Sequence, residues 1–189
     1  QYLHPPGLTG ADAEQLTEDL FHLPNFYVYP LPEDTPPVCA APAEENGFVT
    51  FASFNKPCKM NNTVLDLWSE ILNAVPEARL MLKFKNYMGI PAIKRKFLDR
   101  FEANGISPDR INLVNSENNF YDHLNYYNQT DIALDTFPFA GATTTFQALW
   151  MGVPVISLMT ERFIGRAGGA MSLQAGIDCV VAETPEAYV

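Results

Sequence analysis

The sequence has few of the residues that build covalent or metal-bound frameworks. It contains three cysteines and three histidines in 189 residues. The cysteines are widely spaced, no two form a CxxC pair, and no histidines lie at metal-ligand spacing. We therefore expect neither a disulfide framework nor a metal site, and this cysteine usage is typical of a reducing cytoplasm.

Long apolar segments and an excess of basic residues are also missing. No apolar run approaches the roughly 20 residues that a membrane-spanning helix needs. The first ten residues, QYLHPPGLTG, lack the basic and apolar regions of a signal peptide. The net charge of −10 argues against a nucleic-acid partner. It still permits a nucleotide ligand, because an acidic protein can hold a local positive pocket.

The common enzyme signatures are absent as well. Neither the dinucleotide-binding GxGxxG nor the phosphate-binding GxxxxGK occurs, and no serine lies in GxSxG. No Cys/His pair is suggested by spacing. If the chain belongs to an enzyme, we expect the general acid or base to lie in another part of the protein.

Proline is abundant, but mainly at the start of the chain. Prolines interrupt residues 1–45 at eight positions and leave room for one short helix, Ala11–Leu20, with Thr9 as a possible cap. Aromatic residues in the same segment suggest that it packs on a partner. We predict an extended connector over residues 1–45, followed by one folded lobe over residues 46–189.

From Gly47 onward, strand and helix patterns alternate. We expect strands at Phe48–Phe54, Arg79–Phe84, Arg110–Val114, Ile132–Leu134, Val153–Leu158 and Cys179–Val181. We expect helices at Asn61–Val75, Pro91–Asn104, Asn119–Asn128, Thr143–Met151 and Gly168–Ala175, and one from Thr184 that the end of the chain cuts short. This order predicts an α/β fold with a Rossmann-like, doubly wound parallel sheet.

The most informative segment is DIALDTFPFAGATTTFQALWMGVP, from Asp131 to Pro154. It predicts a short strand, a turn over Pro138–Gly141, and a helix that opens with three threonines from Thr143. Free N–H groups and hydroxyls at such a helix start favour an anion, commonly phosphate. Capping of the helix by a threonine is the alternative. We favour the ligand, because three threonines after Ala-Gly-Ala exceed what a cap requires and small residues allow close approach.

Four other polar residues follow predicted strands. Lys59, in the loop that starts at Asn55, could reach a phosphate at the same sheet edge or be a solvated surface lysine. Asp135 could orient a ligand, although capping of its own turn is the simpler expectation. A lone histidine such as His123 is more often structural. Arg166 could approach a phosphate or pair with a nearby glutamate.

Taken together, these segments resemble a known family. FASFNKPCK, LWSEILNAVPEARLMLK, GISPDRINLV and HLNYYNQTDIALDTFPFAGATTTFQALWMGVPVISL are similar to the catalytic region of O-GlcNAc transferase and its SPINDLY-like relatives. The resemblance runs from Gly47 to Val189. It implies the C-terminal, donor-binding lobe of a two-lobed GT-B glycosyltransferase. The expected donor is a nucleotide-sugar, UDP-GlcNAc in the first instance, used without a metal ion or other cofactor.

The resemblance also implies roles for particular residues. Lys59, as the catalytic group, would meet the donor's diphosphate, and Thr143 and Thr144 would bind it from the helix start. His123 would lie against the uridine or its ribose. The remaining residues assigned to donor binding are Asn55, Gly141, Ala142 and Gln147. The implied partners are an acceptor protein, a missing N-terminal lobe and possibly TPR repeats.

This chain departs from the animal enzymes at the helix start. Ala142 replaces a histidine and Gln147 replaces an acidic residue that commonly holds the ribose, while Phe120 and Tyr126 align with a lysine and an arginine. Base and sugar specificity are therefore open between UDP and GDP donors. The alternative hypothesis is a degenerate lobe that keeps the fold as a binding or interaction module.

Overall fold

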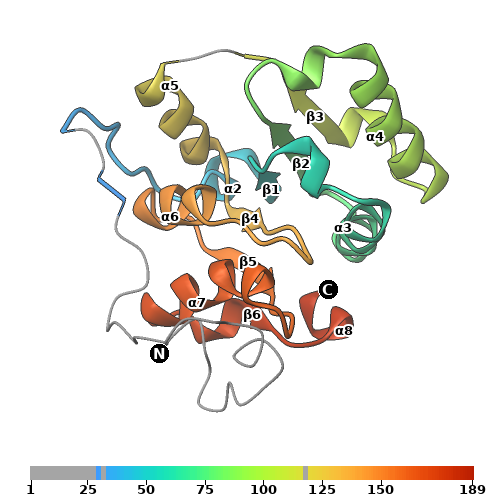
Figure 1. Ribbon diagram of the computed structural model, residues 1–189. Helices are drawn as coiled ribbons and strands as arrows, with labels where there is room; N and C mark the ends of the chain where they lie inside the picture. Colours follow the sequence, from blue (N-terminus) through green and yellow to red (C-terminus); the bar gives the residue numbers. More distant parts are fainter. Residues whose placement is uncertain (1–28, 31–32, 117–118) are drawn as a thin grey trace.

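The structure is a computed structural model that describes residues 29–30, 33–116 and 119–189 (Figure 1). The predicted helix Ala11–Leu20 and most of the predicted connector lie outside the described residues. The division between connector and lobe at residues 45 and 46 therefore stays a prediction.

The described residues form a six-stranded parallel sheet in the order β3-β2-β1-β4-β5-β6. The strands are β1 Thr50–Ser53, β2 Arg79–Lys83, β3 Ile111–Val114, β4 Ile132–Leu134, β5 Val155–Leu158 and β6 Val181–Ala182. The register places Phe51 of β1 between Leu80 of β2 and Ile132 of β4. This order is that of a doubly wound Rossmann-like sheet, so the predicted fold class is confirmed.

Helices and short 3₁₀ turns connect the strands. The helices are α2 Ala43–Asn46, α3 Asn62–Ala74, α4 Pro91–Ala103, α5 Phe120–Asn125, α6 Thr143–Trp150, α7 Ala167–Gln174 and α8 Pro185–Tyr188. Local signals explain the ends of α3 and α4. The side chain of Asn61 caps α3 by accepting from Val64 N at 3.1 Å. Pro91 begins α4, and Gly105, with φ +82°, follows its end.

The sheet separates two hydrophobic cores, as strand alternation requires. On one face, α3, α4 and α8 pack on strand residues such as Phe51 and Leu80. On the other face, α5 and α6 cover the alternate residues Ala52 and Met81. Figure 1 shows these two groups of helices on opposite sides of the sheet. Lys83 stands two residues after Met81 and so belongs to the α5 and α6 face.

The strands predicted at Phe48–Phe54 and Val153–Leu158 are shorter in the structure, and two other predicted elements differ in kind over part of their length. The last strand is Val181–Ala182, not Cys179–Val181, because residues 178–180 form a 3₁₀ turn and only Val181 and Ala182 pair with β5. The helix predicted over Asn119–Asn128 stops at Asn125 and continues as the 3₁₀ turn Tyr126–Gln129. Both differences lie at element ends, where sequence patterns say least.

A buried hydrogen-bond chain ties the last helix to the centre of the sheet. The indole N–H of Trp68 donates to the Tyr188 hydroxyl at 2.9 Å, and this hydroxyl donates to the Asp135 carbonyl at 2.8 Å. All three residues are at most 2% exposed. The chain thus joins α3, α8 and the loop after β4.

Tyr188→Phe should destabilise the fold, because it leaves the buried Trp68 N–H and Asp135 carbonyl without their partner. We expect a loss of about 1–3 kcal/mol in the free energy of unfolding, measured by urea denaturation. Tyr87→Phe is the matched control, since Tyr87 is 37% exposed. Equal losses for the two variants would contradict this role of Tyr188.

Candidate functional site

The strand order creates a switch point between β1 and β4. From these neighbouring strands the chain leaves in opposite directions, to α3 on one face and to α6 on the other. The loops that follow β1 and β4 therefore meet at the carboxyl edge of the sheet. In doubly wound sheets, ligands bind at this position.

Lys59 connects these two loops. It ends the short 3₁₀ turn Pro57–Lys59, and its Nζ donates to the carbonyl oxygen of Ala140 at 2.8 Å. The ammonium also lies 3.9 Å from the centroid of the Phe139 ring. Burial lowers the pKa of Lys59, while the Asp135 carboxylate and the Cys58 thiol act in the opposite direction. Lys59 thus points toward the start of α6 and is not a freely solvated lysine.

The Asp135 carboxylate shapes the loop before α6. Its Oδ1 accepts from the backbone N–H of Thr136 at 2.8 Å and of Gly141 at 2.6 Å. Its Oδ2 accepts from the Ser157 hydroxyl at 3.1 Å. Complete burial raises the pKa of Asp135, and these hydrogen bonds oppose that rise. The capping expectation for Asp135 is confirmed, and the Gly141 N–H is not free as the anion-site prediction assumed.

Gly141 is also required by packing within the loop. A Cβ at this position would lie 2.7 Å from the Thr145 hydroxyl, 2.8 Å from the Thr144 hydroxyl and 2.9 Å from the Asp135 carboxylate. The close approach that the sequence suggested for a ligand is thus explained first by the protein's own side chains.

None of the three threonines caps α6. The helix begins at Thr143, and its N-cap is Ala142, which makes no side-chain cap hydrogen bond. The capping alternative is therefore wrong. Thr145 is buried, while the Thr144 hydroxyl donates to the Asn55 Oδ1 at 3.2 Å. This bond links the loop after β1 to the first turn of α6.

A pocket of about 600 Å³ opens beside this first turn. It is lined by Tyr29, Phe54, Lys83, Phe84, Lys85, Ser116, Phe120, His123, Thr143, Thr144 and Gln147. Aromatic rings form much of its wall, and three polar groups join across it. The Nδ1 of His123 lies 3.1 Å from Lys83 Nζ, and its Nε2 lies 3.1 Å from Gln147 Oε1.

The structure brings the predicted site residues together in two adjoining groups. His123, Thr143, Thr144 and Gln147 line the pocket. Asn55, Lys59, Gly141 and Ala142 belong to the loops beside it and do not line it. Arg166 lies before α7 and does not line the pocket either. The Asn55–Thr144 hydrogen bond connects the two groups.

No sequence pattern had pointed to Lys83 or Phe54, which also line the pocket. Lys83 is 3% exposed and ends β2 directly after the three apolar residues Leu80–Leu82. A charged residue in that position could have indicated a functional site, because burying an ionised side chain costs free energy unless a partner compensates it. Phe54 follows β1 and packs against Tyr127, with 4.7 Å between the centroids of the two rings.

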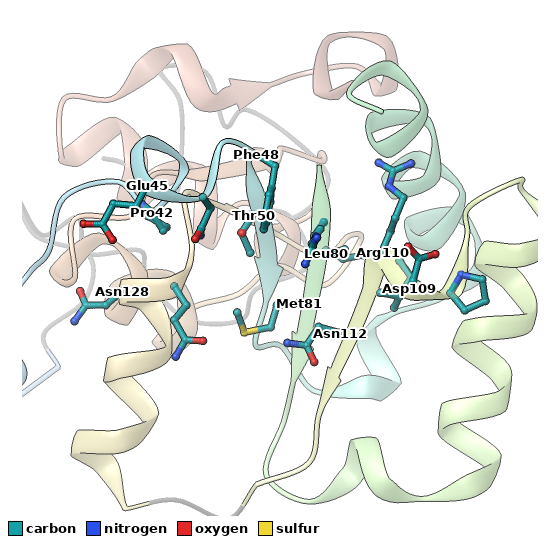
Figure 2. Close-up of a pocket in the computed structure, with 15 residues that line it drawn as sticks. Pro42, Glu45, Phe48, Thr50, Leu80, Met81, Asp109, Arg110, Asn112 and Asn128 are labelled. Carbon is teal, nitrogen blue, oxygen red and sulfur yellow. The ribbon is translucent and has the colours of Figure 1, made fainter. Parts of the chain in front are cut away.

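A second hollow of about 630 Å³ lies at the opposite edge of the sheet (Figure 2). Figure 2 shows residues from the amino ends of the strands around it, including Thr50, Leu80 and Asn112. The guanidinium of Arg110 already donates to three carbonyl oxygens, those of Leu72, Val75 and Ala78. We assign the site to the carboxyl edge, since ligands of parallel sheets bind there.

Two kinds of feature are absent from the described part of the chain. Within residues 29–30, 33–116 and 119–189, no group of three or more His, Cys, Asp or Glu side chains could hold a metal ion. No helix in the same part of the chain is both long enough and apolar enough to span a bilayer.

Comparison with known proteins identifies the family. The sequence model of glycosyl transferase family 41 matches residues 42–189. The chain belongs to this family. A probable UDP-N-acetylglucosamine–peptide N-acetylglucosaminyltransferase SPINDLY of Solanum lycopersicum is 39% identical over 173 residues, 91% of this chain. The family resemblance read from the sequence is confirmed.

A solved family structure has the same fold. A mutant of the Thermobaculum terrenum O-GlcNAc transferase superposes with a TM-score of 0.88 at 37% identity, over all of this chain and 34% of that one. A Caenorhabditis elegans UDP-N-acetylglucosamine–peptide N-acetylglucosaminyltransferase is 30% identical over 144 residues, 75% of this chain. The family 41 chain spans only 18% of the tomato relative and 12% of the nematode one.

The environment of His123 predicts a pH dependence of stability. Burial first, and then the Lys83 ammonium, lower the pKa of His123 below its ordinary 6.5, while the bond with Gln147 opposes them. The unfolded chain therefore takes up this proton first as the pH falls. The free energy of unfolding should decrease below pH 6.5, down to the lowered folded-state pKa, by at most about 1.4 kcal/mol per pH unit.

Urea unfolding of the chain and of His123→Gln, from about pH 7.5 to about pH 5, measures this contribution. Lys83, Asp135 and the other titrating groups are present in both proteins, so the difference between the two curves isolates His123. Parallel curves over the whole range would contradict the prediction.

Proposed function

We propose that this lobe binds the nucleotide-sugar donor of a protein O-glycosyltransferase. The observation that carries the proposal is the Lys59 ammonium, 2.8 Å from the Ala140 carbonyl at the switch point. An aromatic pocket with His123 opens beside it. A cation and a helix start suit a diphosphate, and an aromatic pocket suits the attached nucleoside.

The proposed reaction is inverting and needs no metal ion. A hydroxyl of an acceptor protein attacks the anomeric carbon of the donor sugar, and the bond from that carbon to the diphosphate oxygen breaks. Negative charge grows on the departing diphosphate. Lys59 and the first turn of α6, with Thr143 and Thr144, would stabilise that charge. The group that takes the hydroxyl proton would belong to the rest of the protein.

The nucleoside would occupy the aromatic pocket. The centroid of the His123 ring lies 5.9 Å from that of Phe54 and 6.3 Å from that of Phe120. The histidine is therefore packed between aromatic side chains. Relatives named for UDP-N-acetylglucosamine support a UDP-sugar. By the family resemblance, Phe120 and Tyr126 replace a lysine and an arginine of the animal enzymes. A GDP-sugar is therefore the competing donor.

The second candidate function is a lobe that binds but does not take part in transfer. Ala142 favours it, because this N-cap offers no polar side chain to a donor at the start of α6. The partners proposed for either function are an N-terminal lobe, an acceptor protein and TPR repeats.

Lys59→Ala should weaken the binding of UDP or GDP by about 10- to 100-fold, because a charge-assisted hydrogen bond to the diphosphate is lost. Isothermal calorimetry on the 189-residue chain measures this change. Lys56→Ala is the matched control, since Lys56 is exposed in the same loop. In Lys59→Ala, the free energy of unfolding should fall by less than about 1 kcal/mol.

Failure of both diphosphates to bind the unchanged chain at millimolar concentration would overturn the proposed function. Equal loss of binding and of stability in Lys59→Ala would instead make Lys59 a structural residue.

The chain alone should transfer no sugar to protein. It spans 34% of the solved relative, so the proposed acceptor-side groups are not part of it. Incubation with UDP-N-acetylglucosamine or a GDP-sugar and acceptor peptides, followed by mass spectrometry, tests this. Turnover above a protein-free blank would show that one lobe suffices.

A further inference from the structure

Lys83 is the most unusual charged residue of the pocket. It is 3% exposed, and burial lowers its pKa. Its hydrogen-bond partner among the described residues is the His123 ring, and the nearest aromatic face is Tyr126, 5.0 Å from Nζ to the ring centroid. The one salt bridge of the described residues joins Arg100 and Asp66, so no carboxylate compensates Lys83 there.

The chemistry of these groups fixes the direction of their hydrogen bonds. An ammonium has three donors and no acceptor, so His123 Nδ1 must accept from Lys83. A neutral imidazole then carries its proton on Nε2, and this N–H donates to Gln147 at 3.1 Å. Gln147 must therefore turn its carbonyl oxygen toward His123.

The remaining group of Gln147 is the carboxamide nitrogen. Among the described residues this nitrogen makes no hydrogen bond, and the Gln147 side chain lines the pocket. Its two N–H groups are therefore left for a ligand. A glutamate at this position would accept from the same His123 N–H but would offer an acceptor, not a donor, to the pocket.

We infer that Lys83 is a positioning residue, which acts through His123 to make Gln147 a hydrogen-bond donor that selects an acceptor oxygen on the bound nucleoside. This inference rests on the proposed function, since it names a contact of the proposed donor. The acceptor is either a carbonyl oxygen of the base or a hydroxyl oxygen of the ribose.

Nitrogen-15 NMR of the His123 ring tests the first step without any ligand. The proton should reside on Nε2 in the unchanged chain and in Lys83→Arg, because arginine also only donates. Lys83→Met should raise the share of the Nδ1–H tautomer, with His123→Gln used to assign the signals. A proton on Nδ1 in the unchanged chain, or the same share of the two tautomers in Lys83→Met, would overturn the inference.

Calorimetry with UDP, 2′-deoxy-UDP and GDP tests the second step. Gln147→Met keeps the side-chain length and removes the hydrogen-bond donor, so it should weaken UDP binding by about tenfold. Lys83→Met should weaken UDP by about 3- to 10-fold, and Lys83→Arg should restore most of that loss. Thermal unfolding of each variant identifies any that fail to fold.

The deoxy analogue locates the acceptor. A loss in Gln147→Met that is confined to UDP identifies the 2′ oxygen of the ribose, and an equal loss for UDP and 2′-deoxy-UDP places the acceptor at the 3′ oxygen or a base carbonyl. Unchanged affinity in both Gln147→Met and Lys83→Met, while Lys59→Ala still weakens binding, would overturn this inference alone. Failure of the unchanged chain to bind any diphosphate would instead overturn the proposed function, and the His123 tautomer would remain measurable.

Discussion

The buried carboxylate of Asp135 is the constraint on which the site depends. It holds the loop after β4 through the N–H groups of Thr136 and Gly141. A Cβ on Gly168 of α7 would overlap its Oδ2, so the small residues of that helix make room for it. Tyr188 donates to its backbone carbonyl. The loop that receives Lys59 is thus fixed from β4, α7 and α8, before any ligand binds.

The pocket region carries positive charge, although the chain as a whole is negatively charged. The net charge is −10, yet Lys59, Lys83 and Lys85 gather at the carboxyl edge of the sheet. Burial of Lys59 and Lys83 lowers their pKa values and withdraws their charge from bulk screening. A local positive site in an acidic protein suits an anionic ligand, because its field acts over a short range inside a low-dielectric wall.

Much of the fold could be predicted from the sequence because its signals are local. The stripe of apolar residues in α3, the Asn61 cap and the proline at the start of α4 each act within one or two turns. The last strand was misplaced because its pairing to β5 at Ser157 and Leu158 is a contact between distant segments. The break after Asn125 has the same origin, since Tyr127 is buried against Phe54 and not along a helix stripe.

The sequence by itself determined the alternation of strands and helices, the family, and the set of polar residues that follow strands. These depend on periodicity and on motifs of neighbouring residues. Only the tertiary structure decided which of them meet. The strand order brings Lys59 to Ala140, and alternation within β2 turns Lys83 toward His123. These two contacts join residues 81 and 40 positions apart. No local pattern encodes them, because they follow from how the whole sheet packs.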